Sequence, residues 1–299
     1  MPAYGRFPTQ QLLNVNDQLY MIDCGEGAQM RFSDYGVRWG KLGHIFISHH
    51  HGDHVLGLPG LLSSMGLNRR TAPLRIFGPA EVGRFLESAC AFLGSLSYEV
   101  DFCEVDPERH ALVHEDKRVQ VFSLPLQHSA PTSGYLFRER ERPRHMKAPL
   151  IEQYQIPYSA IPGIKAGAGF DSPVHGFLPN EELTSPAALP RSFAFCSDTR
   201  YAPSLIPYIK GVDLLYHEGT FLEAQQQQAE ETSHSTARQA ARVALSAGAR
   251  QLVLGHYSTR YYTLGGILQE ACSVFPNSLL GFDGLTVPVP LRYPSGPEG

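Results

Sequence analysis

One stretch decides the fold of this chain: His49-His50-His51-Gly52-Asp53-His54. It follows the apolar run 45–48, which is typical of a buried strand. Imidazole nitrogens and carboxylate oxygens are ligands of a borderline divalent cation such as Zn²⁺. A purification tag would contain no Asp, no Gly turn and no preceding strand. Alternating histidines followed by an adjacent Asp-His pair can face two metal ions, so the stretch predicts a metal site directly after a strand.

Composition narrows the class of protein. The chain has 299 residues, 42% of them hydrophobic and 18% charged, which is typical of a globular protein of one large domain or two ordinary ones. A net charge of −4 gives no global attraction to nucleic acid, so a polyanion would need a local basic patch such as 138–147.

Five scattered cysteines without CxxC spacing argue against a disulfide framework and against thiolate zinc. No signal peptide or membrane span is apparent, so we expect a cytoplasmic protein without membrane contact.

Short apolar runs recur along the chain, and each leads into polar residues. They predict strands that end near residues 22, 48, 124, 196, 216 and 254. Helical patterns lie between them, over 55–66, 80–91 and 236–247, the last with Ser233 or Ser235 placed to cap its start. This alternation predicts an α/β sandwich whose functional site lies along one sheet edge.

The segment from about 138 to 191 has a different composition. It is rich in Pro and Gly and mixes charged with aromatic residues. We therefore expect a single domain over 1–299 with an inserted arm over 139–190.

Three further residues extend the metal motif. His128, Asp198 and His256 each follow an apolar run. With His49, His51, Asp53 and His54 they make seven potential ligands, five imidazoles and two carboxylates. Two catalytic zinc ions need three or four protein ligands each plus an open position, and seven residues with one bridging carboxylate meet that number.

These motifs resemble the metallo-β-lactamase superfamily and, within it, the ribonuclease Z family of tRNA 3′-processing endonucleases. The narrower resemblance rests on segments 23–29, 217–221 and 234–237, which begin Asp-Cys-Gly-Glu-Gly, His-Glu-Gly-Thr and His-Ser-Thr, and segment 256–261 also matches the family. Together the matching segments cover almost the whole chain in the family's order. The resemblance implies an αββα sandwich with an inserted flexible arm. It also implies a zinc-dependent endoribonuclease that removes the 3′ trailer from precursor tRNA and leaves a 3′-hydroxyl on the tRNA.

The resemblance also implies roles for the site residues. One zinc ion would take His49, His51 and His128, and a second would take Asp53, His54 and His256, with manganese, iron or cobalt as open alternatives to zinc. Asp198 would bridge the two ions. Asp53 would be both a ligand and the group that orients the attacking water, although a purely ligating Asp53 is an open alternative. Glu218 and His234 resemble the family's proton-donating pair, in which the carboxylate holds the imidazole toward the substrate.

The resemblance also implies contacts with the substrate, although parts of this sequence differ from the family's pattern. Arg260 resembles a residue that meets substrate phosphate. Arg6 remains in a loop that commonly carries Lys and Arg-Asn, but Phe7 stands where Asn is usual. The first N-terminal strand of the family is apparently missing. The arm corresponds to an exosite that binds folded tRNA, and a homodimer is expected.

Two other functions remain open. A hydrolase of small phosphodiesters or of acyl or lactam bonds could use the same metal ligands, but it would need neither Glu218, His234 nor the arm. A catalytically idle RNA-binding relative is the non-enzymatic alternative.

Overall fold

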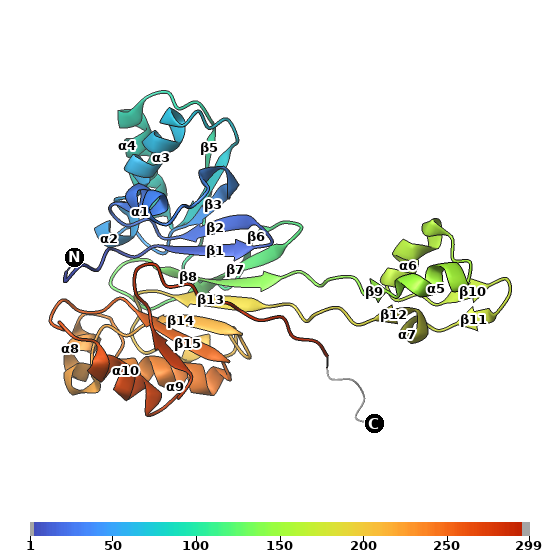
Figure 1. The fold of residues 1–299 in the computed structure, drawn as a ribbon. Helices are drawn as coiled ribbons and strands as arrows, with labels where there is room; N and C mark the ends of the chain where they lie inside the picture. Colours follow the sequence, from blue (N-terminus) through green and yellow to red (C-terminus); the bar gives the residue numbers. More distant parts are fainter. Residues whose placement is uncertain (1–2, 295–299) are drawn as a thin grey trace. The chain divides into compact units, whose positions relative to one another are not determined.

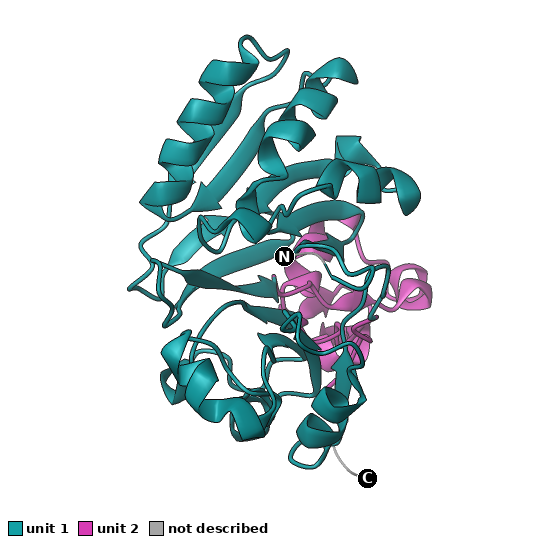
Figure 2. Ribbon diagram, turned by 90° about the vertical axis from the view of Figure 1, so that its left-hand side faces the viewer, with its two compact units in different colours: residues 1–139, 192–287 teal, residues 140–191, 288–299 magenta. Residues whose placement is uncertain are grey.

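The computed structural model describes residues 3–294. The chain divides into two compact units, residues 1–139 with 192–287 and residues 140–191 with 288–299 (Figure 2). The second unit begins within one residue of the expected arm. Whether the whole chain is a single domain that carries this arm stays a prediction. Within 3–294, no helix combines the length and apolar character needed to cross a membrane.

The first unit contains two sheets. The five-stranded sheet has the order β1-β2-β3-β4-β5, and its strands are β1 (Gln11–Val15), β2 (Gln18–Ile22), β3 (Leu42–Phe46), β4 (Leu74–Gly78) and β5 (Val100–Glu104). The seven-stranded sheet has the order β16-β15-β14-β13-β8-β7-β6, and its strands are β6 (Leu112–Glu115), β7 (Val119–Pro125), β8 (Ser133–Glu139), β13 (Ser192–Cys196), β14 (Leu214–Glu218), β15 (Gln251–Gly255) and β16 (Ser278–Leu280). β1 is an edge strand. That this chain lacks the family's first N-terminal strand stays a prediction.

An aromatic layer joins the two sheets. The ring of Phe46 lies 5.3 Å from that of Tyr135 and 5.2 Å from that of Phe137, centroid to centroid, in edge-to-face contacts. The Tyr135 hydroxyl donates to the carbonyl of Ile47 at 2.7 Å, which satisfies a buried polar group across the layer. The inner faces of both sheets are therefore packed against each other.

Helices cover the outer faces of the sheets (Figure 1). Those of the first unit are α1 (Ala28–Asp34), α2 (Gly52–Val55), α3 (Leu58–Leu67), α4 (Ala80–Leu93), α8 (Gln226–Glu231), α9 (Ala237–Ala247) and α10 (Gly265–Cys272), with 3₁₀ turns at Trp39–Lys41, Pro203–Leu205 and Glu223–Gln225. α1, α3 and α4 share one apolar core with the five-stranded sheet, and α9 and α10 share another with the seven-stranded sheet. The expected αββα sandwich is confirmed.

The helix expected over 55–66 is interrupted at Gly57. The Gly57 amide donates to the carbonyl of Cys24 at 2.8 Å, and a Cβ at Gly57 would lie 2.0 Å from the carbonyl oxygen of Gly25. This close backbone contact separates α2 from α3, and Pro59 then stands in the first turn of α3. The metal motif is therefore tied to the segment at 23–25.

The second unit has its own secondary structure and a small apolar core. Its elements are β9 (His145–Met146), α5 (Ala148–Gln153), a 3₁₀ turn (Tyr158–Ala160), α6 (Ile161–Lys165), β10 (Phe170–Ser172), β11 (Gly176–Leu178), α7 (Asn180–Leu183) and β12 (Thr184–Ser185). Ile156, Ile164, Leu178 and Leu183 are buried together. The prolines of this segment, read from the sequence as marks of an irregular arm, include residues in the first turns of α5 and α6.

Candidate metal centre and catalytic pair

Strand ends bring the predicted site residues together. The histidine motif begins three residues after β3, Asp198 follows β13 by two residues, and His256 directly follows β15. β13, β14 and β15 are parallel neighbours, so the residues at their carboxyl ends share one sheet edge. Glu218 is the last residue of β14 and reaches the same edge.

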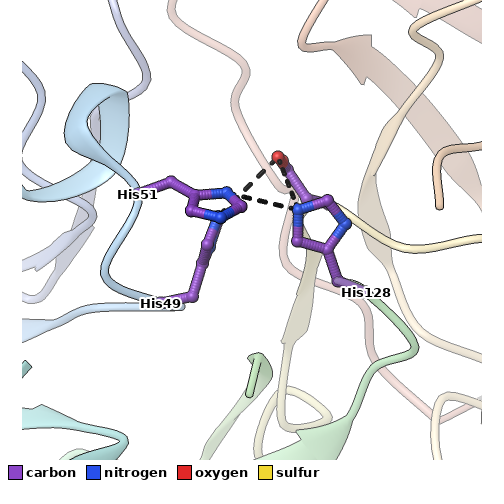
Figure 3. A group of neighbouring side chains, drawn as sticks. His49, His51 and His128 are labelled. Atoms are coloured by element: carbon purple, nitrogen blue, oxygen red, sulfur yellow. Dashed lines mark hydrogen bonds and ion pairs between the residues drawn. The ribbon is translucent and has the colours of Figure 1, made fainter. Parts of the chain in front are cut away.

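One group consists of His49, His51, His128 and Asp198, whose ligand atoms lie within 4.8 Å of one another. The Nε2 atom of His128 is 3.3 Å from Nδ1 of His51. Oδ2 of Asp198 lies 3.8 Å from His49 Nε2 and 3.7 Å from His128 Nε2. Figure 3 shows the three imidazoles converging from two separate loops. The spacing leaves the atoms close enough to share one cation.

A second group consists of Asp53, His54 and His256. His256 Nε2 lies 3.5 Å from Asp53 Oδ2, and His54 Nε2 lies 3.8 Å from the same oxygen. Asp198 also faces this group, since its Oδ2 is 3.4 Å from His256 Nε2 and its Oδ1 is 3.5 Å from His54 Nε2. Asp198 therefore stands between the two groups. His50 is exposed and lies outside both.

Hydrogen bonds at the opposite ring nitrogens orient these imidazoles. Nδ1 of His54 is 2.7 Å from Oδ2 of Asp23, and Asp23 also accepts from the amide of Ser48 at 2.8 Å. His128 donates from Nδ1 to the carbonyl of Ser233 at 3.0 Å. Partners of this kind fix the tautomer of a ligating histidine and leave Nε2 free to face a metal.

The backbone supports the same arrangement. His256 pairs through Nδ1 with the Thr220 hydroxyl at 3.0 Å. Asp23, Ser233 and His256 all have left-handed backbone angles, with φ of 57°, 57° and 55°. Such angles cost energy in residues other than glycine and cluster at functional sites. The surrounding fold holds these three residues in strained positions beside the converging side chains.

The donor set fits divalent cations. Among the described residues, His49 Nε2 and His54 Nε2 are buried and have no hydrogen-bond partner, which is costly unless a cation occupies that direction. Burial lowers the pKa of His49 well below its usual range, which favours the neutral, ligating imidazole. Burial raises the pKa of Asp198, but the imidazoles of His256 and His54 outweigh it and keep the carboxylate ionised.

Glu218 and His234 form a pair beside this centre. His234 Nδ1 lies 2.8 Å from Oε1 of the fully buried Glu218. Glu218 also accepts from the amides of Thr199 at 2.7 Å and Ser235 at 3.1 Å, so its position is fixed. Burial lowers the pKa of His234, but the Glu218 carboxylate reverses this effect and raises it to about 9. The ring stacks on that of His256 with centroids 5.2 Å apart, so the imidazole lies beside the centre.

The two arginines lie at the edge of this region. The Arg260 guanidinium is 5.1 Å above the ring of Phe221, which lies 6.2 Å from the ring of His234. Arg6 donates from Nη2 to the carbonyl of Tyr261 at 3.0 Å. Arg260 therefore lies on the loop that follows His256, and Arg6 is hydrogen-bonded to that loop.

Sequence reasoning missed the residues that orient the ligands. The Ser48 hydroxyl bonds to His49 and His54, and the Thr220 hydroxyl bonds to His256. The backbone carbonyl of Ser233 accepts from His128. Hydroxyl residues beside a motif are common, and a backbone carbonyl has no sequence signal, so none of the three indicates a role alone. Thr220 lies in segment 217–221, and its position two residues after Glu218 is the sequence feature that could have indicated its role. Asp23 lies in the segment 23–29 that carries the resemblance, and it bonds to Nδ1 of His54.

Comparisons with known proteins give a consistent result. Residues 3–121 match the family model described as anti-Pycsar protein Apyc1, and residues 169–257 match the beta-lactamase superfamily domain. A ribonuclease Z of Porphyromonas gingivalis is 48% identical over 276 residues, covering 92% of this chain and 91% of the relative. A ribonuclease Z of Parabacteroides distasonis is 44% identical over 290 residues, covering 97% of this chain and 95% of the relative.

Solved structures share the fold at lower identity. The short form of human tRNase Z has a TM-score of 0.66 and 22% identity, covering 95% of both chains. The metallo-β-lactamase fold protein YhfI of Bacillus subtilis has a TM-score of 0.65 and 18% identity, covering 95% of this chain and 92% of the other. The metallo-β-lactamase fold is therefore shown independently of the close relatives.

Proposed function

This chain belongs to the ribonuclease Z family, and from this premise we propose that it is the endoribonuclease that removes the 3′ trailer from precursor tRNA and leaves a 3′-hydroxyl on the tRNA. The enzyme is a hydrolase with a metal site. The observation that carries the proposal is the contact of the Glu218–His234 pair with the cluster of imidazoles and carboxylates. An acyl or lactam hydrolase has no need of that pair.

Two zinc ions per subunit would be held by this cluster. His49, His51 and His128 would hold one ion, and Asp53, His54 and His256 the other, with Asp198 between them. Support comes from the convergence of one ring nitrogen of each histidine, and from Nε2 of His49 and of His54, which are buried without partners. Ions held there would supply Lewis acidity, which lowers the pKa of a water molecule and stabilises negative charge on phosphodiester oxygens. Imidazole-rich ligation favours zinc over magnesium or calcium.

The chain's own side chains would perform the proton transfers. Burial raises the pKa of Asp53, but the bond to His256 outweighs this and holds its carboxylate ionised, so it can accept a hydrogen bond from the attacking water and orient it. His234 would donate its proton to the departing 3′-oxygen of the tRNA, because an alkoxide is a poor leaving group. Glu218 would keep the imidazole charged and aimed.

Substrate would be held by phosphate contacts and by the second unit. Arg260 and Arg6 are placed beside the His256 loop, where a guanidinium fork can meet phosphate oxygens. Residues 140–191 would bind folded tRNA by shape and phosphate contacts, with cations along 140–147 and with exposed aromatic side chains at Tyr158 and Phe177.

A homodimer and a cytoplasmic location complete the proposal. In a dimer the arm of one subunit could serve the other's centre. The cysteines are all free, as expected in a reducing compartment where precursor tRNA is found.

The direct test is cleavage of an end-labelled precursor tRNA, followed by analysis of the product ends. We expect a single cut at the start of the trailer, with a 3′-hydroxyl on the tRNA and a 5′-phosphate on the trailer. A cut that leaves a 3′-phosphate or cyclic phosphate would contradict the proposed chemistry.

A further inference from the structure

Two exposed aromatic rings meet where the N-terminal segment contacts the loop that follows His256. Tyr4 and Tyr262 are in edge-to-face contact, with ring centroids 5.0 Å apart and an interplanar angle of 87°. The Arg6 guanidinium lies 5.2 Å from the centroid of the Tyr4 ring. We name Tyr4, Arg6 and Tyr262 the aromatic rim. Its parts come from opposite ends of the sequence and are joined by the bond from Arg6 to the carbonyl of Tyr261.

The rim keeps large aromatic surface in water. Tyr4 is 55% exposed and Tyr262 is 75% exposed. Aromatic rings contribute most to folding when they are buried, so their exposure here brings the fold little stability. A surface of aromatic rings with adjacent cations is typical of a site that receives a ligand.

A strained turn holds Tyr4 at the rim. The Arg6 amide donates to the carbonyl of Ala3 at 3.0 Å, and the two central residues have positive φ, 55° at Tyr4 and 76° at Gly5. This is the pattern of a type I′ turn, which favours Asn or Asp before Gly. A tyrosine at the first central position costs backbone energy, and strain of this kind indicates a functional demand on the side chain.

The rim is continuous with the catalytic pair. Tyr262 lies six residues after His256, on the loop that also carries Arg260. The Arg260 guanidinium covers Phe221, whose ring contacts that of His234. The loop is fixed to the site by the amide of Ser258, which donates to the carbonyl of Thr220 at 3.1 Å. A single-stranded segment that crosses the centre would therefore reach the rim next.

We propose that Tyr262, supported at its ring by Tyr4, is a stacking site for one unpaired base of the RNA segment that crosses the metal centre. The inference rests on the proposed function. Every base has a π-face, so an aromatic ring can hold trailers or acceptor ends of any sequence. Arg6, beside the Tyr4 ring, and Arg260, on the same loop as Tyr262, supply positive charge for the phosphates of the bound segment.

The test compares Tyr262→Ala with Tyr262→Phe in precursor cleavage and in hydrolysis of a small chromogenic diester. Loss of one base stack is expected to raise KM for the precursor by roughly 5- to 150-fold in the alanine variant, with kcat unchanged. The phenylalanine variant keeps the ring and should stay close to wild type. Diester hydrolysis should be equal in all three proteins, which also shows that each is folded.

Precursors with one abasic site at each unpaired position locate the stacked base. At one position the abasic substitution should remove most of the difference between wild type and Tyr262→Ala. Phe92→Ala is the matched control, because Phe92 is 88% exposed on α4 and no role is proposed for it. Two results would overturn the stacking site alone. One is an unchanged KM in Tyr262→Ala. The other is a difference in KM between wild type and Tyr262→Ala that is the same for every abasic precursor. A wild-type protein that cuts no precursor would overturn the proposed function and the stacking site together.

Discussion

At the scale of single residues, His234 is subject to two opposing influences. Burial disfavours its charge, whereas the Glu218 carboxylate at 2.8 Å favours it and raises the pKa to about 9. A protonated imidazole at neutral pH is suited to give a proton to a poor leaving group. His234→Ala is therefore expected to lower kcat for precursor tRNA by about 10²- to 10⁴-fold.

The small chromogenic diester is the control for this variant. Its phenolate leaving group needs no proton, so the alanine variant should hydrolyse it at nearly the wild-type rate with unchanged metal content. Steady-state kinetics on both substrates measure the two effects. A loss of equal size on the diester would mean that His234 maintains the metal centre rather than protonating the leaving group.

His44 provides a pH prediction distant from the metal ligands. Its ring stacks on Tyr20 at 5.5 Å and lies 4.3 Å from the ring of His114. Burial, followed by the charge of His114, lowers the pKa of His44 to about 4. The other charged groups that act on it are Asp116, Arg75 and Arg70.

Because the folded pKa of His44 lies below the unfolded value of 6.5, the unfolded chain binds more protons between pH 6.5 and 4. The stability from its neutral form is complete above pH 6.5 and is lost as the pH falls toward 4. His44→Phe should reduce this loss by on the order of 1 kcal/mol, since the ring is only partly buried. Urea denaturation of metal-free protein at pH 7 and pH 4.5 measures the difference.

An exposed histidine serves as the control for that measurement. His145→Phe should leave the pH dependence of stability as in the wild type, because the ring is exposed in the folded protein. The same pH dependence in His44→Phe as in the wild type would contradict the assignment to His44.

At the scale of elements, the sequence predicted six strands and three helical stretches, and it left other strands such as β4, β5 and β8 without a prediction. Apolar runs before Asp198 and His256 became β13 and β15, since buried strands carry an unbroken apolar signal. The helical pattern over 55–66 missed the break at Gly57, although Gly57 and Pro59 are local signals for one. Only the backbone contact with 24–25 is absent from the local pattern. Long-range contacts of this kind also place Thr220 and Ser233 at the site.

The second unit is the element whose role can be tested separately. β8 and β13 pair antiparallel, with Arg138 opposite Ser192, so residues 140–191 can be replaced by a short Gly-Asn-Gly turn. The shortened protein is expected to lose cleavage of precursor tRNA while it still hydrolyses the small diester. Gel assays and diester kinetics on the same preparation make the comparison, and equal loss of both activities would contradict a separate tRNA-binding role.

At the scale of the whole molecule, the ligands could be predicted because each is a strong side chain at the end of a strand. The αββα sandwich brings seven of them together from four separate segments of the chain. The small core of the second unit could not be predicted, since Ile156, Ile164, Leu178 and Leu183 lie among Pro and Gly without a regular period. Its stability depends on contacts between short elements.

We infer that the converging side chains form a two-metal centre that cuts precursor tRNA. The most direct measurement is a titration of metal-free protein with Zn²⁺, following bound metal and precursor cleavage together. Cleavage should be absent without metal and should reach its maximum at two ions per subunit, with the 3′-hydroxyl product throughout. Full cleavage by protein shown to contain no metal would contradict the claim.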